Sequence, residues 1–361
     1  MSKIFFKKKK KIIYIDKSKI KINKPNLYNL EKFDRNEIAA VLSSNIVVLM
    51  RHWIKFQQEW VSNIYRKFKD YEKYLIIMYL VSKSWESDST LFKFYSMDEY
   101  YSKDNIRLPN ISLSELSESL KIPKETIRRK LIDLEKQNFI KREGQKIFLG
   151  KPVLSLQKPE KSIKKMSVFF EKLSILLSAQ DWFGPSINRG DIELYFKKYY
   201  TIFWNLFFKL QIPFLVRWKT IFGDLETFIV WSNMGINQNI SLEKDLKGIY
   251  EKESSKLEMK KEEYIENIIN MGDKEAVNSM HGVNGSSISE ISSIPRATVM
   301  RKLNKLLKAK IIKRNKKLEY FLTGQGKLNE KIKANYLINQ TNIAQFITNI
   351  FNLIKKSSLK I

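Results

Sequence analysis

The sequence predicts a mainly α-helical protein with small β-hairpins, built from two copies of one unit. Three observations support this prediction. The stretch "IPKETIRRKLIDLEKQNFIKREG" at residues 122–144 returns without a gap, reworded, as "IPRATVMRKLNKLLKAKIIKRNK" at residues 294–316. Apolar residues recur at helical spacing within both stretches. An aromatic-rich segment of helical character precedes each of them. We therefore expect one copy over residues 45–150 and the other over residues 190–327.

Composition favours a folded protein with a polyanionic partner. Hydrophobic residues make up 43% of the 361 residues, which is enough for a sizeable core. The formal net charge of +28 attracts polyanions, of which nucleic acid and acidic membrane surfaces are the main classes. The absence of Cys excludes disulfides and thiolate chemistry and fits a reducing compartment. We expect a cytoplasmic, nucleoid-associated protein.

Residues 1–44 are predicted to form a basic, partly disordered arm. Residues 1–24 alone carry a net charge of +9. This arm is either simply solvated or in contact with nucleic acid phosphates. The apolar run after its lysines, "IIYI", is shorter than the roughly 7–15 residues of an export signal.

The most apolar window, residues 199–218, is predicted to be a buried helix. Lys209, Gln211 and Pro213 interrupt it, whereas a spanning helix needs roughly 18 or more apolar residues, so no membrane contact is expected. Aromatic residues at helical spacing predict packing between the copies, with a small-molecule effector pocket or a homodimer surface as the alternatives. They are Trp53, Trp60, Tyr65, Trp204, Phe207, Phe208 and Trp218.

The repeated stretch begins with a short helix. In "ISLSELSESL" the residues Leu113, Leu116 and Leu120 share one helical face, and Ser112 or Ser114 can cap it. The following "KIP" ends this helix, because proline cannot continue a helix but is well placed to begin the next one.

A second helix and a hairpin follow. In "PKETIRRKLIDLEKQ" the residues Ile127, Leu131 and Leu134 form a buried stripe. "FIKREGQKIFL" predicts two short strands around a turn, in which Gly144 supplies a positive φ. Asn315 is expected to play that part in copy two, since Asn tolerates the left-handed region.

The similarity extends upstream of the repeated stretch. "LSELSESLKIP" aligns with "ISEISSIP" after a gap of three residues, which predicts that the first helix of copy two is shorter by about one turn. Further back, "FKDYEKYLI" at residues 68–76 resembles "FGDLETFIV" at residues 222–230.

Helix, turn, helix and cationic hairpin resemble the winged helix-turn-helix of GntR-like and MarR-like transcriptional regulators, over about 40 residues in each copy. In such domains the second helix enters the major groove of DNA and the wing contacts the backbone or the minor groove. The resemblance implies that DNA is contacted by Lys124, Glu125, Thr126, Arg128, Arg129, Lys141, Arg142 and Lys146 in copy one, and by Arg296, Thr298, Arg301, Lys302, Lys313, Arg314, Lys316 and Lys317 in copy two.

The two copies are expected to differ in task. Met300 replaces Arg128, so copy two loses a guanidinium that could read guanine bidentately. Residues 286–327 carry a net charge of +9, against +3 for residues 111–149. We therefore expect copy one to read bases and copy two to hold phosphates.

The remaining segments are interpreted by composition. Residues 151–189 are predicted to be a linker followed by a helix, and residues 328–361 a C-terminal helical tail. Residues 242–275 hold seven basic and ten acidic side chains and form a charged insertion. This insertion is either a solvated helix or a segment that folds over basic surface and competes with DNA.

No catalytic or metal-binding constellation is visible. The only two histidines, His52 and His281, lie far apart in the sequence, and no phosphate-binding glycine loop is present. We expect neither a cofactor nor a metal nor an enzymatic activity.

The sequence therefore predicts a sequence-specific, double-stranded DNA-binding transcriptional regulator that uses two winged helices in one chain. Two alternatives remain open: a plasmid-type replication initiator or partition protein, and a winged-helix scaffold that holds protein partners without binding DNA.

Overall fold

The computed structural model describes residues 33–90, 93–103, 106–144, 146–150, 159–253, 267–270, 273 and 281–358. The predicted basic arm over residues 1–32 and the linker over residues 151–158 lie outside this part of the chain. The described residues are mainly helical and carry two small antiparallel sheets. The mainly α-helical fold with hairpins is thereby confirmed.

The first half of the chain contains the following elements: α1 (Arg35–Ser44), α2 (Ile46–Phe68), α3 (Tyr71–Thr90), α4 (Met97–Tyr101), β1 (Ile106–Leu108), α5 (Leu113–Leu120), α6 (Lys124–Lys136), β2 (Ile140–Glu143) and β3 (Lys146–Leu149). The second half contains α8 (Glu160–Ser178), α9 (Arg189–Lys198), α10 (Tyr200–Phe222), α11 (Leu225–Glu253), α13 (Gly285–Ser292), α14 (Arg296–Lys308), β4 (Ile312–Arg314), β5 (Tyr320–Leu322) and α15 (Asn329–Ser358).

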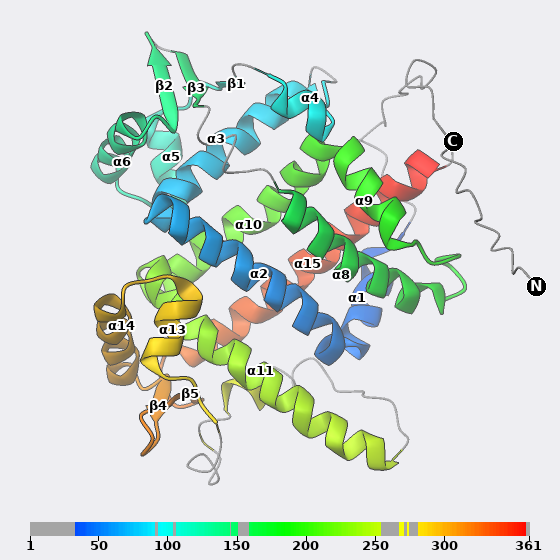
Figure 1. Ribbon diagram of the computed structural model, residues 1–361, viewed down its shortest axis with the longest axis vertical. Coiled ribbons are helices and arrows are strands. Elements are labelled where there is room, and N and C mark those ends of the chain that lie inside the picture. The colour runs from blue at the N-terminus through cyan, green and yellow to red at the C-terminus, as the bar shows by residue number, and fades with distance from the viewer. Residues whose placement is uncertain are drawn as a thin grey trace, which may run out of the picture.

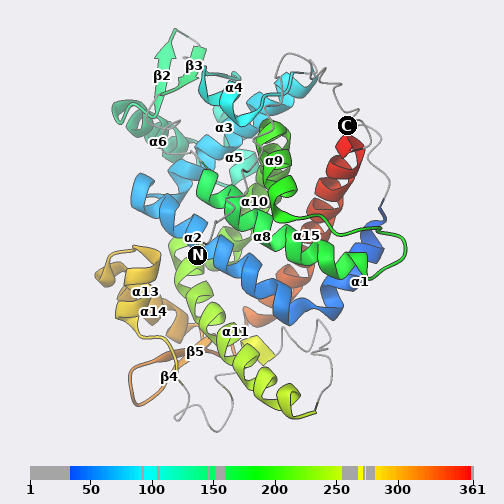
Figure 2. The same ribbon diagram turned by 45° about the vertical axis from the view of Figure 1, so that its right-hand side comes forward.

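Long helices form the centre of the molecule, and the short helices with their hairpins lie at its periphery. In Figure 1, α5, α6 and their hairpin occupy the upper left, and α13, α14 and theirs the lower left, with α2 between them. We call α5, α6 and β1–β3 the first unit, and α13, α14, β4 and β5 the second unit. Both units therefore lie on one side of the central helices, and Figure 2 shows the same arrangement after a turn of the molecule.

The central helix α10 is apolar on most sides and deeply buried, as predicted for residues 199–218. Phe203 and Phe207 are fully buried, and the ring of Phe207 packs edge-on against Trp60 of α2 at 5.2 Å. Pro213 lies inside the helix without ending it. The seven predicted aromatic residues are core side chains, as the packing interpretation expects: Trp53, Trp60, Tyr65, Trp204, Phe207, Phe208 and Trp218 are each buried. No helix among the described residues is long and apolar enough to cross a membrane.

Both ends of the described chain belong to the core, and the helix found at the N-terminal end lies inside the predicted basic arm. Residues 35–44, assigned to the basic arm, form α1, which Asp34 caps by accepting from the backbone N–H of Asn36 and Glu37. The C-terminal helical tail predicted over residues 328–361 is found as α15, whose Ile347 and Phe351 are fully buried. Helix α8 confirms the helix expected after the linker.

The first unit forms as its sequence predicts. Ser112 caps α5 by accepting from the backbone N–H of Glu115 at 3.0 Å. Pro123 precedes α6, whose Ile127 and Leu134 are fully buried. The hairpin gains a third strand, since β1 pairs with β3 and the order is β1-β3-β2. Strand β1 was missed because three residues are too short to show a period of two.

The predicted shortening of the second unit's first helix is wrong, because α13 and α5 each contain 8 residues. Asn284 caps α13 as Ser112 caps α5, accepting from the N–H of Ser287 at 2.9 Å. The gap arose because Gly285 and Ser292 lack the apolar side chains that mark the ends of α5. The two helices align without a gap.

The turn of the second hairpin also differs from the prediction. Gly144 has the expected positive φ of 60°, but in the second hairpin this conformation belongs to Leu318, with φ 61°, and not to Asn315. Asn315 is buried, and its side-chain oxygen accepts from the N–H of Glu319 at 2.9 Å. The loop between β4 and β5 is longer than the loop between β2 and β3, and the hydrogen bond of Asn315 stabilises it.

Candidate DNA-binding interface

Helix α6, the second helix of the first unit and its candidate recognition helix, presents a cationic face. The buried stripe of α6 turns its other side outward, so that Lys124, Glu125, Arg128 and Arg129 are exposed and Thr126 is half-buried. Within the described part of the chain, neither Lys124 nor Arg129 forms an ion pair. These two cations are therefore available to an incoming phosphate or base edge.

Arg128 is held by a neighbour on its own helix. Its Nε donates to one carboxylate oxygen of Glu125 at 2.9 Å and its second terminal nitrogen to the other at 2.7 Å. This bond lowers the pKa of the Glu125 carboxyl and raises that of Arg128. The same two N–H groups would face the acceptor pair of guanine, so reading a base requires Arg128 to leave Glu125.

The wing of the first unit carries paired and unpaired cations. Lys141 contacts Glu143 at 2.8 Å, and Arg142 contacts Glu135 at 3.3 Å. Lys146 is exposed and has no ion pair among the described residues. These pairs are exposed, so each is worth little on its own and can be exchanged for a phosphate.

The second unit offers more unpaired charge. Its exposed cations without an ion pair in the described part of the chain are Arg296, Arg301, Arg314, Lys316 and Lys317. Thr298 is half-buried among them. Lys313 differs, because its Nζ lies 2.8 Å from Asp273, which also accepts from Thr323 and from the N–H of Gly324. Asp273 belongs to the predicted charged insertion over residues 242–275, and its contacts place it beside the second hairpin.

Lys302 stands apart from the other predicted DNA contacts. Its side chain is only 13% exposed, and its Nζ lies 2.7 Å from Asp224 at the start of α11. Burial opposes ionisation of Asp224, but hydrogen bonds from Lys302 and Thr227 outweigh it and lower the pKa of Asp224 to about 2. Lys302 therefore ties α14 to α11 and is not free for DNA.

The first unit contains the matching arrangement. Lys130, the counterpart of Lys302, contacts Asp70 and, at 3.2 Å, Glu72. Asp70 precedes α3 as Asp224 precedes α11. Lys130 was not among the predicted contacts, and its ion pairs explain why a Lys is needed here.

Met300 faces the protein. It is half-buried, and a Cβ placed on Gly285 would lie 2.8 Å from its sulfur. Gly285 stands where the first unit has Leu113, so the Met300 side chain fills space beside α13. The position that carries an exposed Arg128 in the first unit is a packing position in the second.

Each central helix contacts the unit that lies further from it in the sequence. Arg66, near the end of α2, donates from Nε to the Ser293 hydroxyl at 2.8 Å. Lys219, near the end of α10, donates to the carbonyl oxygen of Lys121 at 2.7 Å. Lys121 and Ser293 are the turn residues between the two helices of their units, with φ of 52° and 62°.

The comparisons with known proteins agree with this geometry. Residues 108–143 match the family model of the DeoR-like helix-turn-helix domain. The match covers α5, α6 and β2, and it is DeoR-like rather than GntR-like or MarR-like. It lies within the first unit and does not extend to the second. Comparison with curated proteins and with solved structures finds no significant match.

The chain therefore carries a helix-turn-helix domain of a class that binds DNA in transcription regulation, and double-stranded DNA is the partner that this domain suggests. Among the described residues, no group of three or more His, Asp or Glu side chains could hold a metal ion.

Proposed function

We propose that this chain is a sequence-specific transcriptional regulator that binds double-stranded DNA through two winged helices. The observation that carries the proposal is a backbone pattern that occurs twice. The left-handed turn residues Lys121 and Ser293 are 172 positions apart, and so are Asn138 and Lys310, which follow the recognition helices with φ of 57° and 55°. This shared backbone pattern supports the proposal that the second unit is a winged helix like the first.

The ends of α2 and α10, and the starts of the helices that follow them, also share a pattern. Lys69 and Gly223 end α2 and α10 in the left-handed conformation. Asp70 and Asp224 then accept from backbone N–H groups of the following helix, at 2.8 and 2.7 Å. A duplicated unit of this kind can place two recognition helices as a two-fold dimer does, in major grooves one turn or about 34 Å apart.

The exposed side chains suit the two units to different contacts with DNA. Lys124, Arg128 and Arg129 equip the first unit to reach base edges. In the second unit Met300 is packed inward, and a grip on phosphates is favoured by the exposed cations that have no ion pair among the described residues, namely Arg296, Arg301, Arg314, Lys316 and Lys317. Because the unit is duplicated, one chain can place two units on DNA without forming a homodimer. Such a protein acts in the cytoplasm, on DNA of the nucleoid, and performs no catalysis.

Binding to purified genomic fragments, followed by titration of a selected duplex, tests the proposal. We expect Arg129→Ala to weaken specific binding by about 1–3 kcal/mol, because the proposal places Arg129 at a base edge. Lys172→Ala, which changes an exposed Lys of α8 outside both units, is the control and should leave affinity unchanged. Equal affinity of both variants for the duplex would contradict the proposal.

Salt dependence separates the alternatives. A DNA-binding protein loses affinity steeply as salt rises, whereas a winged-helix scaffold for protein partners shows little affinity at any salt concentration. A replication initiator or partition protein would also bind DNA, but its selected fragments would contain repeated sites at an origin rather than single sites at promoters.

A further inference from the structure

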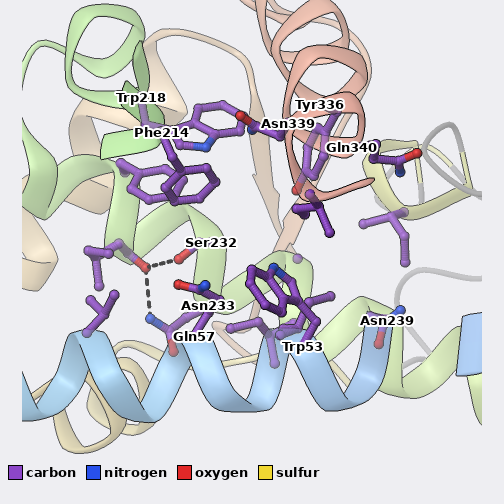
Figure 3. A pocket seen from close by; sticks show the side chains of 18 of the residues that line it. Trp53, Gln57, Phe214, Trp218, Ser232, Asn233, Asn239, Tyr336, Asn339 and Gln340 are labelled. Atoms are coloured by element: carbon purple, nitrogen blue, oxygen red, sulfur yellow. Dashed lines mark hydrogen bonds between the residues drawn. The ribbon is translucent and has the colours of Figure 1, made fainter. Parts of the chain in front are cut away.

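A cavity lies where the two halves of the chain meet. It has a volume of about 150 Å³, and its walls come from α2, α10, α11 and α15. Figure 3 shows Trp53 and Gln57 on α2 facing Phe214 and Trp218, with Tyr336 of α15 beside them. Helix α2 precedes the first unit, and α10 and α11 precede the second, so both halves build this site.

The walls are aromatic and uncharged. Trp218 stacks on Phe228 with ring centroids 4.8 Å apart and meets Tyr336 edge-on at 5.5 Å. None of the described residues that line the cavity carries a charged side chain, although the chain has a net charge of +28. Such walls favour flat, neutral rings over ions.

Three polar atoms of the lining residues have no hydrogen-bond partner in the described part of the chain. They are Nε1 of Trp218, Nδ2 of Asn339 and Oε1 of Gln57. Trp218 is 1% and Asn339 4% exposed. Arg217 donates to the Asn339 oxygen at 2.5 Å, which fixes the orientation of the amide and leaves its NH₂ group to donate elsewhere. Each unpartnered atom costs about 1–3 kcal/mol, and a ligand can recover part of that cost.

We propose that this cavity binds a small, uncharged, planar heteroaromatic molecule. Ring acceptors of the ligand would face Trp218 and Asn339, and a ring N–H would face Gln57. A cavity of about 150 Å³ can hold a benzene ring, so the ligand has one or two rings.

The cavity is connected to both DNA-binding units. Trp218 is the neighbour of Lys219, which holds the turn of the first unit through the Lys121 carbonyl. Helix α2, which carries Trp53, ends near Arg66, which holds the turn of the second unit. A ligand between α2 and α10 therefore adjusts the separation of the two recognition helices and, with it, DNA affinity. This regulatory role rests on the proposed function, whereas the binding site does not.

Calorimetry on the full chain without DNA tests the site. The probes are benzimidazole and quinazolin-4-one, which carry a ring acceptor and a ring N–H, with benzimidazole-5-carboxylate as the charged control. We expect saturable binding of at least one neutral probe, at least tenfold tighter than that of the carboxylate. If neither neutral probe saturates, or if the carboxylate binds equally well, the cavity is not such a site.

The chain offers matched variants for this test. Asn339 and Asn335 both accept from Arg217 and lie on α15, but only Asn339 lines the cavity. Asn339→Leu should weaken probe binding at least fivefold, and Asn335→Leu should not. Ser232→Leu fills the cavity, whereas Ser241→Leu changes a Ser of α11 that lies outside it, with a similar bond to its own helix. Equal losses within either pair would overturn the assignment.

Duplex titration with and without a saturating probe tests the regulatory role. We expect DNA affinity to shift at least threefold in the natural chain and not in Ser232→Leu. If the probe binds but affinity does not shift, the site stands and its regulatory role fails. If no duplex is bound at all, the proposed function fails, while the calorimetric result still decides the site.

Discussion

One lysine on α6 and one on α14 act within the protein. Lys130 and Lys302 occupy matching positions, and each contacts an aspartate that precedes the helix supporting its unit. Both side chains are largely buried, at 15% and 13% exposure. They orient α6 and α14 on α3 and α11, and thereby set the direction in which the exposed cations point.

Replacing Lys302 should therefore lower stability. Lys302→Ala leaves the partly buried Asp224 without its main cation, and we expect a loss of about 1–3 kcal/mol in the free energy of unfolding. Lys308→Ala removes an exposed Lys of the same helix and should cost well under 1 kcal/mol by the same denaturant titration. Equal effects would show that the ion pair does not hold α14.

The pH dependence of stability provides a second test at this scale. The pKa of Asp224 is about 2 in the folded chain, below its ordinary value of 3.8. The carboxylate therefore stabilises the fold fully above pH 4, and this contribution of about 2 kcal/mol is lost as the pH falls towards 2. Other acids titrate in the same range, so the comparison is between the natural chain and Asp224→Asn. The variant should show a shallower loss of stability between pH 4 and 2, and parallel curves would contradict the ion pair.

At the scale of the element, the two hairpins reach similar shapes by different means. The first uses Gly144 at φ 60°, and the second places Leu318 at φ 61° in a longer loop. A Cβ on Gly144 would meet no atom within 4 Å, so only backbone strain opposes a side chain there. Leu318 already bears that strain while its side chain is 60% exposed.

Opposite effects of substitution follow. Gly144→Ala should destabilise the chain by about 1 kcal/mol, because the left-handed region costs an L-residue about 1–2 kcal/mol. Leu318→Gly should stabilise it or leave it unchanged, since relief of strain offsets the added flexibility of glycine. Thermal unfolding of the two variants measures this contrast, and destabilisation by Leu318→Gly would show that its side chain has a packing role.

The sequence predicted elements where local signals were strong. Ile127, Leu131 and Leu134 indicated α6, and Pro123 indicated its start, because period and proline geometry act within one turn. The predicted length of α13 was wrong, because Gly285 stands where the first unit has an apolar residue and leaves room for the Met300 side chain. The candidate site was predicted as a set of exposed cations, but Lys302 could not be distinguished from them. Its partner Asp224 lies far away in the sequence, and only tertiary packing brings the two together.

At the scale of the whole molecule, the central helices fix the two units relative to each other. Arg66 and Lys219 each reach across to the turn between the two helices of a unit, and both contacts connect segments far apart in the chain. Lys219 is 9% exposed and also lies 3.0 Å from Glu72 at the start of α3. These contacts connect the units through packed helices, in contrast to domains joined by a flexible linker.

A rigid connection makes a specific prediction about DNA. Without a ligand in the cavity, the proposed regulator should tolerate one separation of its half-sites, because the packed central helices hold its recognition helices at that separation. Inserting either 5 or 10 base pairs between the half-sites of a selected duplex should lower affinity to that of a single half-site, by about 10²-fold or more, since bivalent binding is lost. A flexible linker would instead retain most of its affinity after the 10-base-pair insertion, which restores the face of the helix. Anisotropy titrations with the three duplexes and a single half-site distinguish these results. The double variant Arg66→Ala, Lys219→Met should bind the original duplex less tightly and discriminate less between spacings, because it removes both contacts that hold the units in place.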